Sequence, residues 1–170
     1  MNQQYWVEFD KRWNQRLAIG EGSRLKRFFA ILFAHSGDSW FWLLGLFIVW
    51  LVGNPSWKAW ALQVGAAIVF LAVTVLVMKF SFRRARPEGT WGNVYRKSDP
   101  HSFPSGHAAR SALLAVLAAG LGPGWLAALL IPWAPLVSLA RVSMGLHYPT
   151  DVLAGGALGL LVGIAVLLIL

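Results

Sequence analysis

The sequence contains no cysteine and only seven aspartate and glutamate residues among its 170 positions. Without cysteine, a disulfide framework and a thiolate metal site are both excluded. The seven carboxylates form no cluster with metal-ligand spacing, so we expect neither a metal ion nor another cofactor. The N-terminal stretch MNQQYWVEFDKRWNQR lacks the apolar run of a signal peptide, so we expect no cleaved leader.

Charged residues of either sign are also scarce, at 13%, whereas hydrophobic residues make up 57% of the chain. This balance is typical of a membrane protein rather than of a soluble domain. In a soluble protein, the net charge of +8 and the pI near 10.7 would suggest nucleic-acid binding. Here they fit anionic lipid headgroups, a phosphate substrate or membrane topology, and we expect membrane lipids rather than nucleic acid as partners.

Long apolar runs predict an all-α fold, a bundle of transmembrane helices. The clearest run, residues 60–80, would extend about 31 Å as a helix, which matches the thickness of a hydrocarbon core. Residues 1–37 are amphipathic and predict an interfacial N-terminal segment before a transmembrane core of residues 38–170. A sixth span results if the stretch from Phe28 to Ala34 also crosses the bilayer. The four other expected spans are residues 39–52, 105–121, 125–146 and 149–170.

Successive spans run in opposite directions, which places three polar segments on one face of the membrane. They follow the second span, begin the third and join the fourth to the fifth, and the N-terminal segment shares their face. Their sequences are KFSFRRARP at 79–87, PSGH at 104–107 and ARVSMGLHYPTD at 140–151. We therefore expect a polar site at this face.

Three of the basic residues in these segments are candidates for binding an anion: Lys79, Arg86 and Arg141. A single Lys or Arg at a helix end is commonly an interfacial anchor. Arg141 has no acidic neighbour in sequence, however, and an arginine at the end of a span calls for an anion. Three such cations on one face predict a site for a phosphate dianion.

Ser105, Gly106 and His107 open the third span, where free backbone N–H groups and the helix dipole favour an anion. The alternative is plain helix capping with a polar interfacial histidine. His147 and Asp151 are four residues apart and can share a helical face, so the carboxylate can orient the imidazole. A purely structural His–Asp pair is the alternative there. The remaining histidines, His35 and His101, are expected to be structural or surface residues.

Together these segments resemble the motifs of the type 2 phosphatidic acid phosphatase superfamily of membrane lipid phosphatases, K-x6-R-P, P-S-G-H and S-R-x5-H-x3-D. The first two are complete at Lys79 to Pro87 and Pro104 to His107. The third departs at one position, where Ala140 replaces the serine and removes one hydrogen bond to phosphate. Three ordered motifs with matching spacing are far more specific than any one of them.

The resemblance implies that His147 is the nucleophile that forms a phosphohistidine and that Asp151 orients it. His107 would protonate the leaving oxygen and then deprotonate the attacking water. The phosphate oxygens would be held by Lys79, Arg86, Arg141 and the Ser105–Gly106 backbone.

The implied substrates are lipid phosphates: a polyprenyl diphosphate or monophosphate, phosphatidylglycerophosphate or phosphatidic acid. A catalytically inactive membrane protein that binds or moves phospholipids is the alternative, and the hydropathy excludes a soluble haloperoxidase relative. In the 88–103 loop, Trp91 and Tyr95 are candidates for headgroup contact.

Two further expectations concern the membrane. Every Lys and Arg except Lys58 falls on the active-site face, so the positive-inside rule favours a cytoplasmic site in a multi-pass cell-membrane protein. That bias disappears if Phe28 to Ala34 crosses the bilayer, and outer-face activity is common in the bacterial family. Gly155, Gly159 and Gly163 recur every four residues and predict close helix packing, within the chain or in an oligomer.

Overall fold

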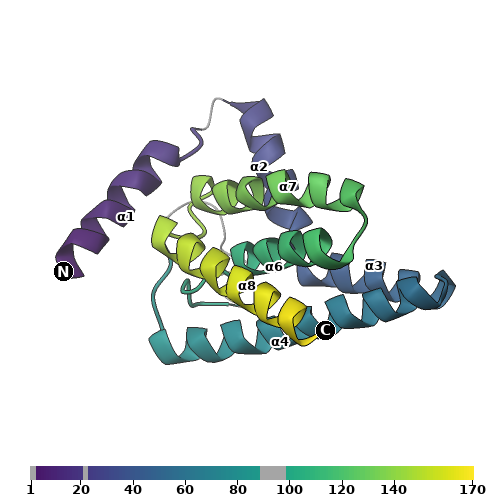
Figure 1. Ribbon diagram of the computed structural model, residues 1–170. Coiled ribbons are helices and arrows are strands. Elements are labelled where there is room, and N and C mark those ends of the chain that lie inside the picture. The colour runs from purple at the N-terminus through teal and green to yellow at the C-terminus, as the bar shows by residue number, and fades with distance from the viewer. Residues whose placement is uncertain (1–2, 21–22, 89–98) are drawn as a thin grey trace.

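The computed structural model describes residues 3–20, 23–88 and 99–170, which are almost entirely helical (Figure 1). Within these ranges there is no strand, only an isolated bridge between Ala85 and His101. The expected all-α class is therefore confirmed. The helices are α1 (Gln3–Leu17), α2 (Arg24–Ser36), α3 (Ser39–Val52), α4 (Pro55–Phe82), α6 (Gly106–Leu121), α7 (Gly124–Ser143) and α8 (Pro149–Ile169).

Three described helices, α4, α7 and α8, are long and apolar enough to cross a membrane. The α2–α3 pair, bent by 56°, can form a fourth span, and α6 is a shorter apolar helix. The five spans expected from hydropathy thus correspond to α3, α4, α6, α7 and α8. Large apolar side chains are exposed on their outer faces, among them Phe47, Phe70 and Leu161. Lipid covers such surfaces at no cost, because hydrocarbon is as apolar as they are.

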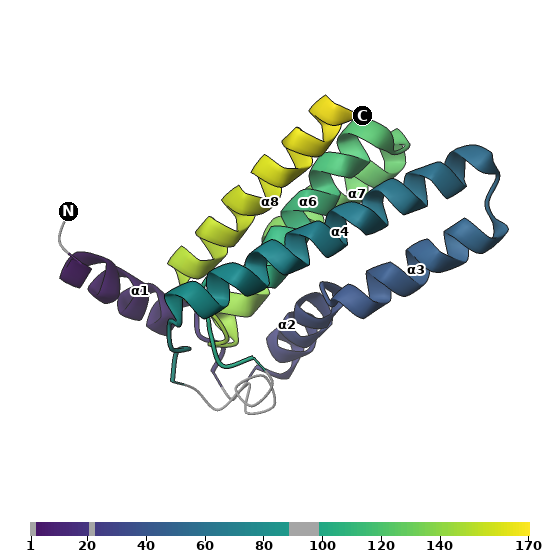
Figure 2. The same ribbon diagram turned by 90° about the horizontal axis from the view of Figure 1, so that it is seen from below.

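Helix α6 lies at the centre of the bundle, with α4, α7 and α8 around it (Figure 2). Its contact with α8 is close because glycines face it. A Cβ added to Gly159 would lie 1.9 Å from the Ala109 carbonyl oxygen, and one added to Gly155 would lie 2.3 Å from that of Ser105. Only glycine fits such distances, so the predicted close packing is confirmed within the chain.

Helices α3 and α4 form an antiparallel hairpin beside this bundle (Figure 2). Asn54 precedes α4, and its side-chain oxygen accepts a hydrogen bond from the Trp57 amide at 3.0 Å. Pro55 occupies the first turn, where its missing N–H costs nothing. The hairpin carries α4 along the bundle so that its C-terminal end reaches the polar end of the molecule.

Helix α7 ends at Ser143, three residues before the expected boundary. Gly145 adopts a positive φ of 63°, a left-handed conformation that cannot continue the helix. Glycine takes this conformation without the strain that an L side chain would suffer. The amides of Leu146 and His147 then both donate to the Arg141 carbonyl oxygen, at 3.1 and 3.3 Å. This tight turn directs His147 back into the bundle instead of toward solvent.

The N-terminal segment lies at the same end of the bundle as this turn (Figures 1 and 2). The Ile19 amide donates to the Ser143 carbonyl oxygen at 3.1 Å. Asp10 of α1 is 1% exposed and accepts a hydrogen bond from the Thr150 amide at 3.1 Å. Helix α1 is therefore attached to the start of α8, beside the polar segments of the sequence.

Candidate active site

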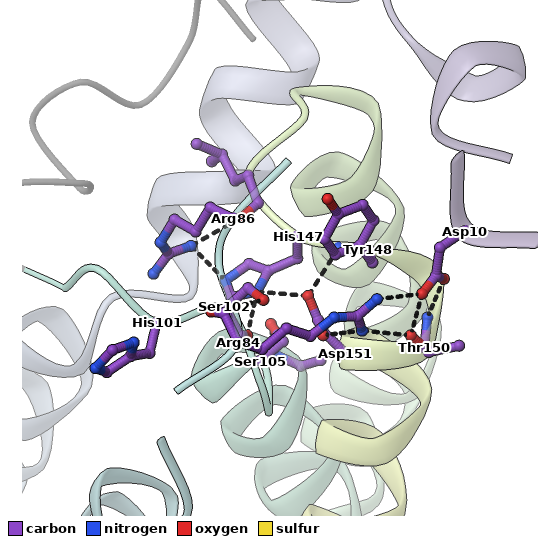
Figure 3. Close-up of polar contacts among 12 residues, drawn as sticks. Asp10, Arg84, Arg86, His101, Ser102, Ser105, His147, Tyr148, Thr150 and Asp151 are labelled. Carbon is purple, nitrogen blue, oxygen red and sulfur yellow. Dashed lines mark hydrogen bonds and ion pairs between the residues drawn. The ribbon is translucent and has the colours of Figure 1, made fainter. Parts of the chain in front are cut away.

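His147 sits in the α7–α8 turn and is 1% exposed. Its Nδ1 lies 2.8 Å from the Ser102 carbonyl oxygen, and its Nε2 lies 3.1 Å from Nη1 of Arg86 (Figure 3). A carbonyl can only accept a hydrogen bond and a guanidinium can only donate one. The ring is therefore a neutral imidazole that carries its proton on Nδ1 and directs the Nε2 lone pair at Arg86.

The electrostatic surroundings reinforce this protonation state. Burial, together with the positive charges of Arg141, Arg86 and Lys79, holds the pKa of His147 well below its usual value of 6.5. Both effects disfavour the imidazolium form. At neutral pH the ring thus presents a nucleophilic nitrogen among cations.

Asp151 lies farther from His147 than a hydrogen bond allows, with 3.7 Å between Oδ2 and Nδ1. Its Oδ2 instead accepts from the Tyr148 amide at 2.9 Å, and its Oδ1 accepts from Arg84 at 2.7 Å. The reason is positional, because Asp151 is the third residue of α8 and caps the first free N–H groups of that helix. The spacing of four places both residues on one face, but the Nδ1–H group of His147 donates its hydrogen bond to the Ser102 carbonyl oxygen.

Arg84 connects Asp151 to the N-terminal helix (Figure 3). Its guanidinium donates to Asp151 and, at 2.5 Å, to Oδ2 of Asp10. Burial disfavours the charge, but the hydrogen bond that Arg84 donates to Asp10 and the charges of both carboxylates outweigh it and raise the pKa of Arg84. Neither Asp10 nor Arg84 was predicted from the sequence, because 74 positions separate them.

Lys79 and Arg86, two of the expected phosphate ligands, converge on the carboxylate of Asp99. Nη2 of Arg86 donates to Oδ2 of Asp99 at 2.8 Å, and Lys79 donates to the same oxygen. Lys79 also donates to the His101 carbonyl oxygen at 3.0 Å. Two buried cations directed at one oxygen form a seat for an anion, which an internal carboxylate occupies here. Asp99 was not predicted, and its only sequence signal is the scarcity of carboxylates.

Arg141, the third expected cation, lies at the end of α7 and is 1% exposed. Its backbone carbonyl oxygen accepts a hydrogen bond from the His147 amide at 3.3 Å, and its charge is one of those that depress the pKa of His147. The structure thus assembles the three predicted basic residues around His147.

Ser105 and Gly106 form the start of α6, as the sequence predicted. Ser105 is its N-cap, and its side chain accepts from the Ala108 amide at 3.5 Å. The Ser105 amide donates to the Asp151 carbonyl oxygen at 2.9 Å, which joins the start of α6 to the first turn of α8. A Cβ on Gly106 would lie 3.4 Å from Val75, so the start of α6 packs at van der Waals distance from α4.

His107 faces the same region from the first turn of α6. Its Nε2 lies 2.7 Å from Oδ1 of Asp38, in the segment between α2 and α3. This pair was not predicted from the sequence, and His35 was expected to be a structural or surface residue. The ring of His35 lies 3.3 Å from the other oxygen of Asp38.

A cavity of about 300 Å³ connects these groups. One end is polar and is lined by Lys79, Asp99, His107, Arg110 and His147. The other end follows α4 and is aliphatic, with Ile68, Leu71, Val75 and Leu76. The cavity can hold a molecule with an anionic head and an apolar body. The two loop candidates for headgroup contact, Trp91 and Tyr95, lie outside the described residues.

The chain is similar in sequence to several curated phosphatases. Over 104 residues the chain is 35% identical to an undecaprenyl-diphosphatase of Sulfolobus acidocaldarius, covering 57% of this chain and 50% of the relative. Over 108 residues it is 35% identical to a decaprenylphosphoryl-5-phosphoribose phosphatase of Mycobacterium tuberculosis, covering 62% and 58%. The chain thus spans little more than half the length of these curated relatives.

Two solved structures share the fold. A transmembrane PAP2-type phosphatidylglycerolphosphate phosphatase of Bacillus subtilis superposes with a TM-score of 0.81 at 23% identity, covering 97% of this chain and 85% of that one. LpxE of Aquifex aeolicus gives 0.74 at 24% identity, covering 93% and 94%. Residues 60–170, which contain all three motifs, match the family model of the PAP2 superfamily, and the chain belongs to that family.

Proposed function

We propose that the protein is an integral-membrane lipid phosphate phosphatase that works through a phosphohistidine. The observation that carries the proposal is the neutral His147, whose Nε2 lone pair points toward Arg86 beside an anion seat. A phosphate bound by Lys79 and Arg86 would take the place of the Asp99 carboxylate. Its phosphorus would then lie next to a nitrogen that already carries a lone pair, and positioning supplies much of the catalysis in phosphoryl transfer.

The reaction has two steps. In the first, Nε2 of His147 forms a bond to phosphorus, the bond to the lipid oxygen breaks, and His107 donates a proton to that oxygen. In the second, His107 takes a proton from water, the water oxygen bonds to phosphorus, and the bond to Nε2 breaks. Arg86 and Arg141 offset the charge that develops on the phosphoryl oxygens. Asp151 supports His147 through the α8 cap instead of through a direct hydrogen bond.

The shape of the cavity supports a lipid substrate. Its aliphatic end follows α4 toward the middle of the span, at the depth that hydrocarbon occupies in a bilayer. The candidate substrates are polyprenyl diphosphates or monophosphates, phosphatidylglycerophosphate and phosphatidic acid. The matched relatives named for polyprenyl substrates favour the first of these classes.

The test is phosphate release from a panel of these four lipids by the purified full chain in detergent micelles, with His147→Ala as the control. Turnover of at least one lipid by the wild type and none by the variant is expected. Failure of the wild type on every lipid would favour the alternative of a catalytically inactive phospholipid-binding protein. Full activity in the variant would contradict the phosphohistidine mechanism.

We also propose that the site faces the cytoplasm and that residues 1–37 lie in the membrane interface. The attachment of α1 to Arg84 and Thr150 supports keeping the N-terminal basic residues on the active-site face. The positive-inside rule then applies to all the basic residues except Lys58. Labelling Glu88→Cys in intact cells with a membrane-impermeant thiol reagent tests the orientation, because the chain has no native cysteine. Labelling without permeabilisation would place the site outside.

A further inference from the structure

The break between α2 and α3 is held in place by three other side chains. A break leaves backbone polar groups without helical partners, and here donors from different helices approach them. Nε1 of Trp42 donates to the Ser36 carbonyl oxygen at 2.9 Å, and Arg110 donates to the Gly37 carbonyl oxygen. Nε1 of Trp133 donates to the Ser36 hydroxyl at 2.9 Å. Helices α3, α6 and α7 thus fix the position of this short segment.

Asp38 ends the break as the N-cap residue of α3, yet its side chain makes no capping hydrogen bond. An aspartate at this position ordinarily accepts from the N–H of the second or third helical residue. Instead, Oδ1 lies 2.7 Å from Nε2 of His107. The carboxylate is directed at an imidazole 69 positions away rather than at its own helix.

Gly37 is what lets this segment come so close to the imidazole. A Cβ built on Gly37 would lie 3.0 Å from Cδ2 of His107 and 3.1 Å from Cγ1 of Val137. A larger residue would push the ring or the break aside. Close approach at Gly37 and the forgone cap at Asp38 are independent features, and both bear on the position of the same ring.

We propose that Asp38 is the positioning residue of His107, an inference that rests on the proposed phosphatase function. A carboxylate only accepts hydrogen bonds, so Nε2 keeps its proton, and Nδ1 becomes the nitrogen that exchanges protons. Nδ1 then donates to the leaving lipid oxygen as the phosphorus–oxygen bond breaks, and later takes a proton from water. Asp38 touches no substrate atom and acts only through the orientation and tautomer of the ring.

The experiment is a double-mutant cycle with Asp38→Asn and His107→Gln, measured on whichever lipid phosphate the wild type hydrolyses. Asp38→Asn should lower kcat about 10- to 100-fold, the range seen when the carboxylate partner of a metal-bound histidine is removed, with KM little changed. In the His107→Gln background the same substitution should have no further effect, because its target is gone. Losses that multiply in the double variant would overturn the inference.

The leaving group supplies a second readout. In a nitrophenyl phosphate that carries a long alkyl chain, the leaving group is a nitrophenolate, which needs no proton. On this substrate the Asp38→Asn loss should largely disappear from the first step, measured as the burst of nitrophenolate, whereas a general distortion of the site would slow the first step equally on both substrates. Equal losses would therefore overturn the inference. A wild type without activity on any substrate would overturn the proposed function, and this inference with it.

A second variant keeps the test sharp if Asp38→Asn does not fold. Gly37→Ala displaces the break relative to the ring and should reproduce the leaving-group signature on a smaller scale. Gly45→Ala in α3 is its matched control, because an added Cβ there meets nothing within 4 Å. Equal activity of the two alanine variants on the lipid substrate would contradict the inference.

Discussion

The two histidines of the site line one cavity but are held in opposite ways. Nδ1 of His147 donates a hydrogen bond to a backbone carbonyl at 2.8 Å, and the carboxylate of Asp151 lies 3.7 Å from this nitrogen. His107 has a carboxylate at 2.7 Å. A carbonyl fixes a tautomer without adding charge, which suits a nucleophile that must stay neutral. A carboxylate that accepts from Nε2 fixes the other tautomer and leaves Nδ1 as the nitrogen that exchanges protons.

The sequence spacing indicated only that His147 and Asp151 can meet on one helical face. In the structure they do share that face, but the hydrogen bonds of the carboxylate go to the start of α8 and to Arg84. A tighter pair joins Asp38 and His107, which are far apart in the chain. Spacing along a helix shows which residues share a face, but it does not show which hydrogen bond forms.

Removing the nucleophile should have the largest effect. His147→Gln is expected to lower kcat by about 10⁴-fold or more, as loss of a nucleophile does in other covalent catalysts. Rapid quenching with a radiolabelled substrate should show an acid-labile, alkali-stable phosphoenzyme in the wild type and none in the variant. A phosphoenzyme in His147→Gln would place the covalent step on another residue.

Removing the general acid should lower kcat less than removing the nucleophile does, and it should change how much phosphoenzyme accumulates. His107→Gln is expected to slow lipid turnover by about 10²- to 10⁴-fold, the usual contribution of general acid–base catalysis. With a nitrophenyl phosphate the first step needs no acid, so the variant should accumulate phosphoenzyme that water attacks slowly. A His107→Gln protein that forms no phosphoenzyme from either substrate would remove the distinction between the two histidines.

The indirect support of His147 can be tested at Arg84. Arg84→Gln leaves the buried carboxylates of Asp10 and Asp151 without their shared cation, and about 1.4 kcal/mol of lost positioning corresponds to a tenfold lower kcat. The matched control is Arg83→Gln, since exposed Arg83 donates to the Phe80 carbonyl oxygen of α4 and to no carboxylate among the described residues. If both variants keep wild-type kcat, the link from α1 to the site has no role in catalysis.

The smallest expected effect is a shift in pH dependence. Because the pKa of His147 is depressed, falling pH protonates the nucleophile only below its usual value of 6.5. The acidic limb of kcat/KM should therefore lie below pH 6.5. Arg86→Gln removes one of the charges that depress this pKa, so in the residual activity the limb should move to higher pH. A limb that stays in place would mean that another group sets it.

The close packing of α8 on α6 could be predicted from the spacing of glycines in the sequence. The glycines of α8 recur every four residues, which is a local pattern visible in the sequence. Their effect is also local, since Gly155 and Gly159 touch the backbone of α6 at Ser105 and Ala109. This contact brings the start of α6 against the first turn of α8 and sets the distance between the two motifs.

The four carboxylates of the site show what sequence motifs could not predict. Of the seven in the chain, Asp10, Asp38, Asp99 and Asp151 each contact a basic residue or a histidine at this end. Only Asp151 belonged to a recognisable motif. In so apolar a chain, the few carboxylates are the groups available to pair with buried basic residues, because a buried charge needs a partner. Their scarcity was the signal in the sequence that each of them could belong to the site.

Hydropathy and motif spacing were enough to place the spans, the polar face and the residues of the three motifs, because apolar runs and helical periodicity act over a few residues at a time. The hydrogen-bond partners of those residues depended on tertiary structure. Ser102 reaches His147 across 45 positions and Asp38 reaches His107 across 69, and neither pairing has a local signature. A hydrogen bond forms only within a few tenths of an ångström of its best length. That precision comes from the packing of α6 against α8 and from the fixed break between α2 and α3.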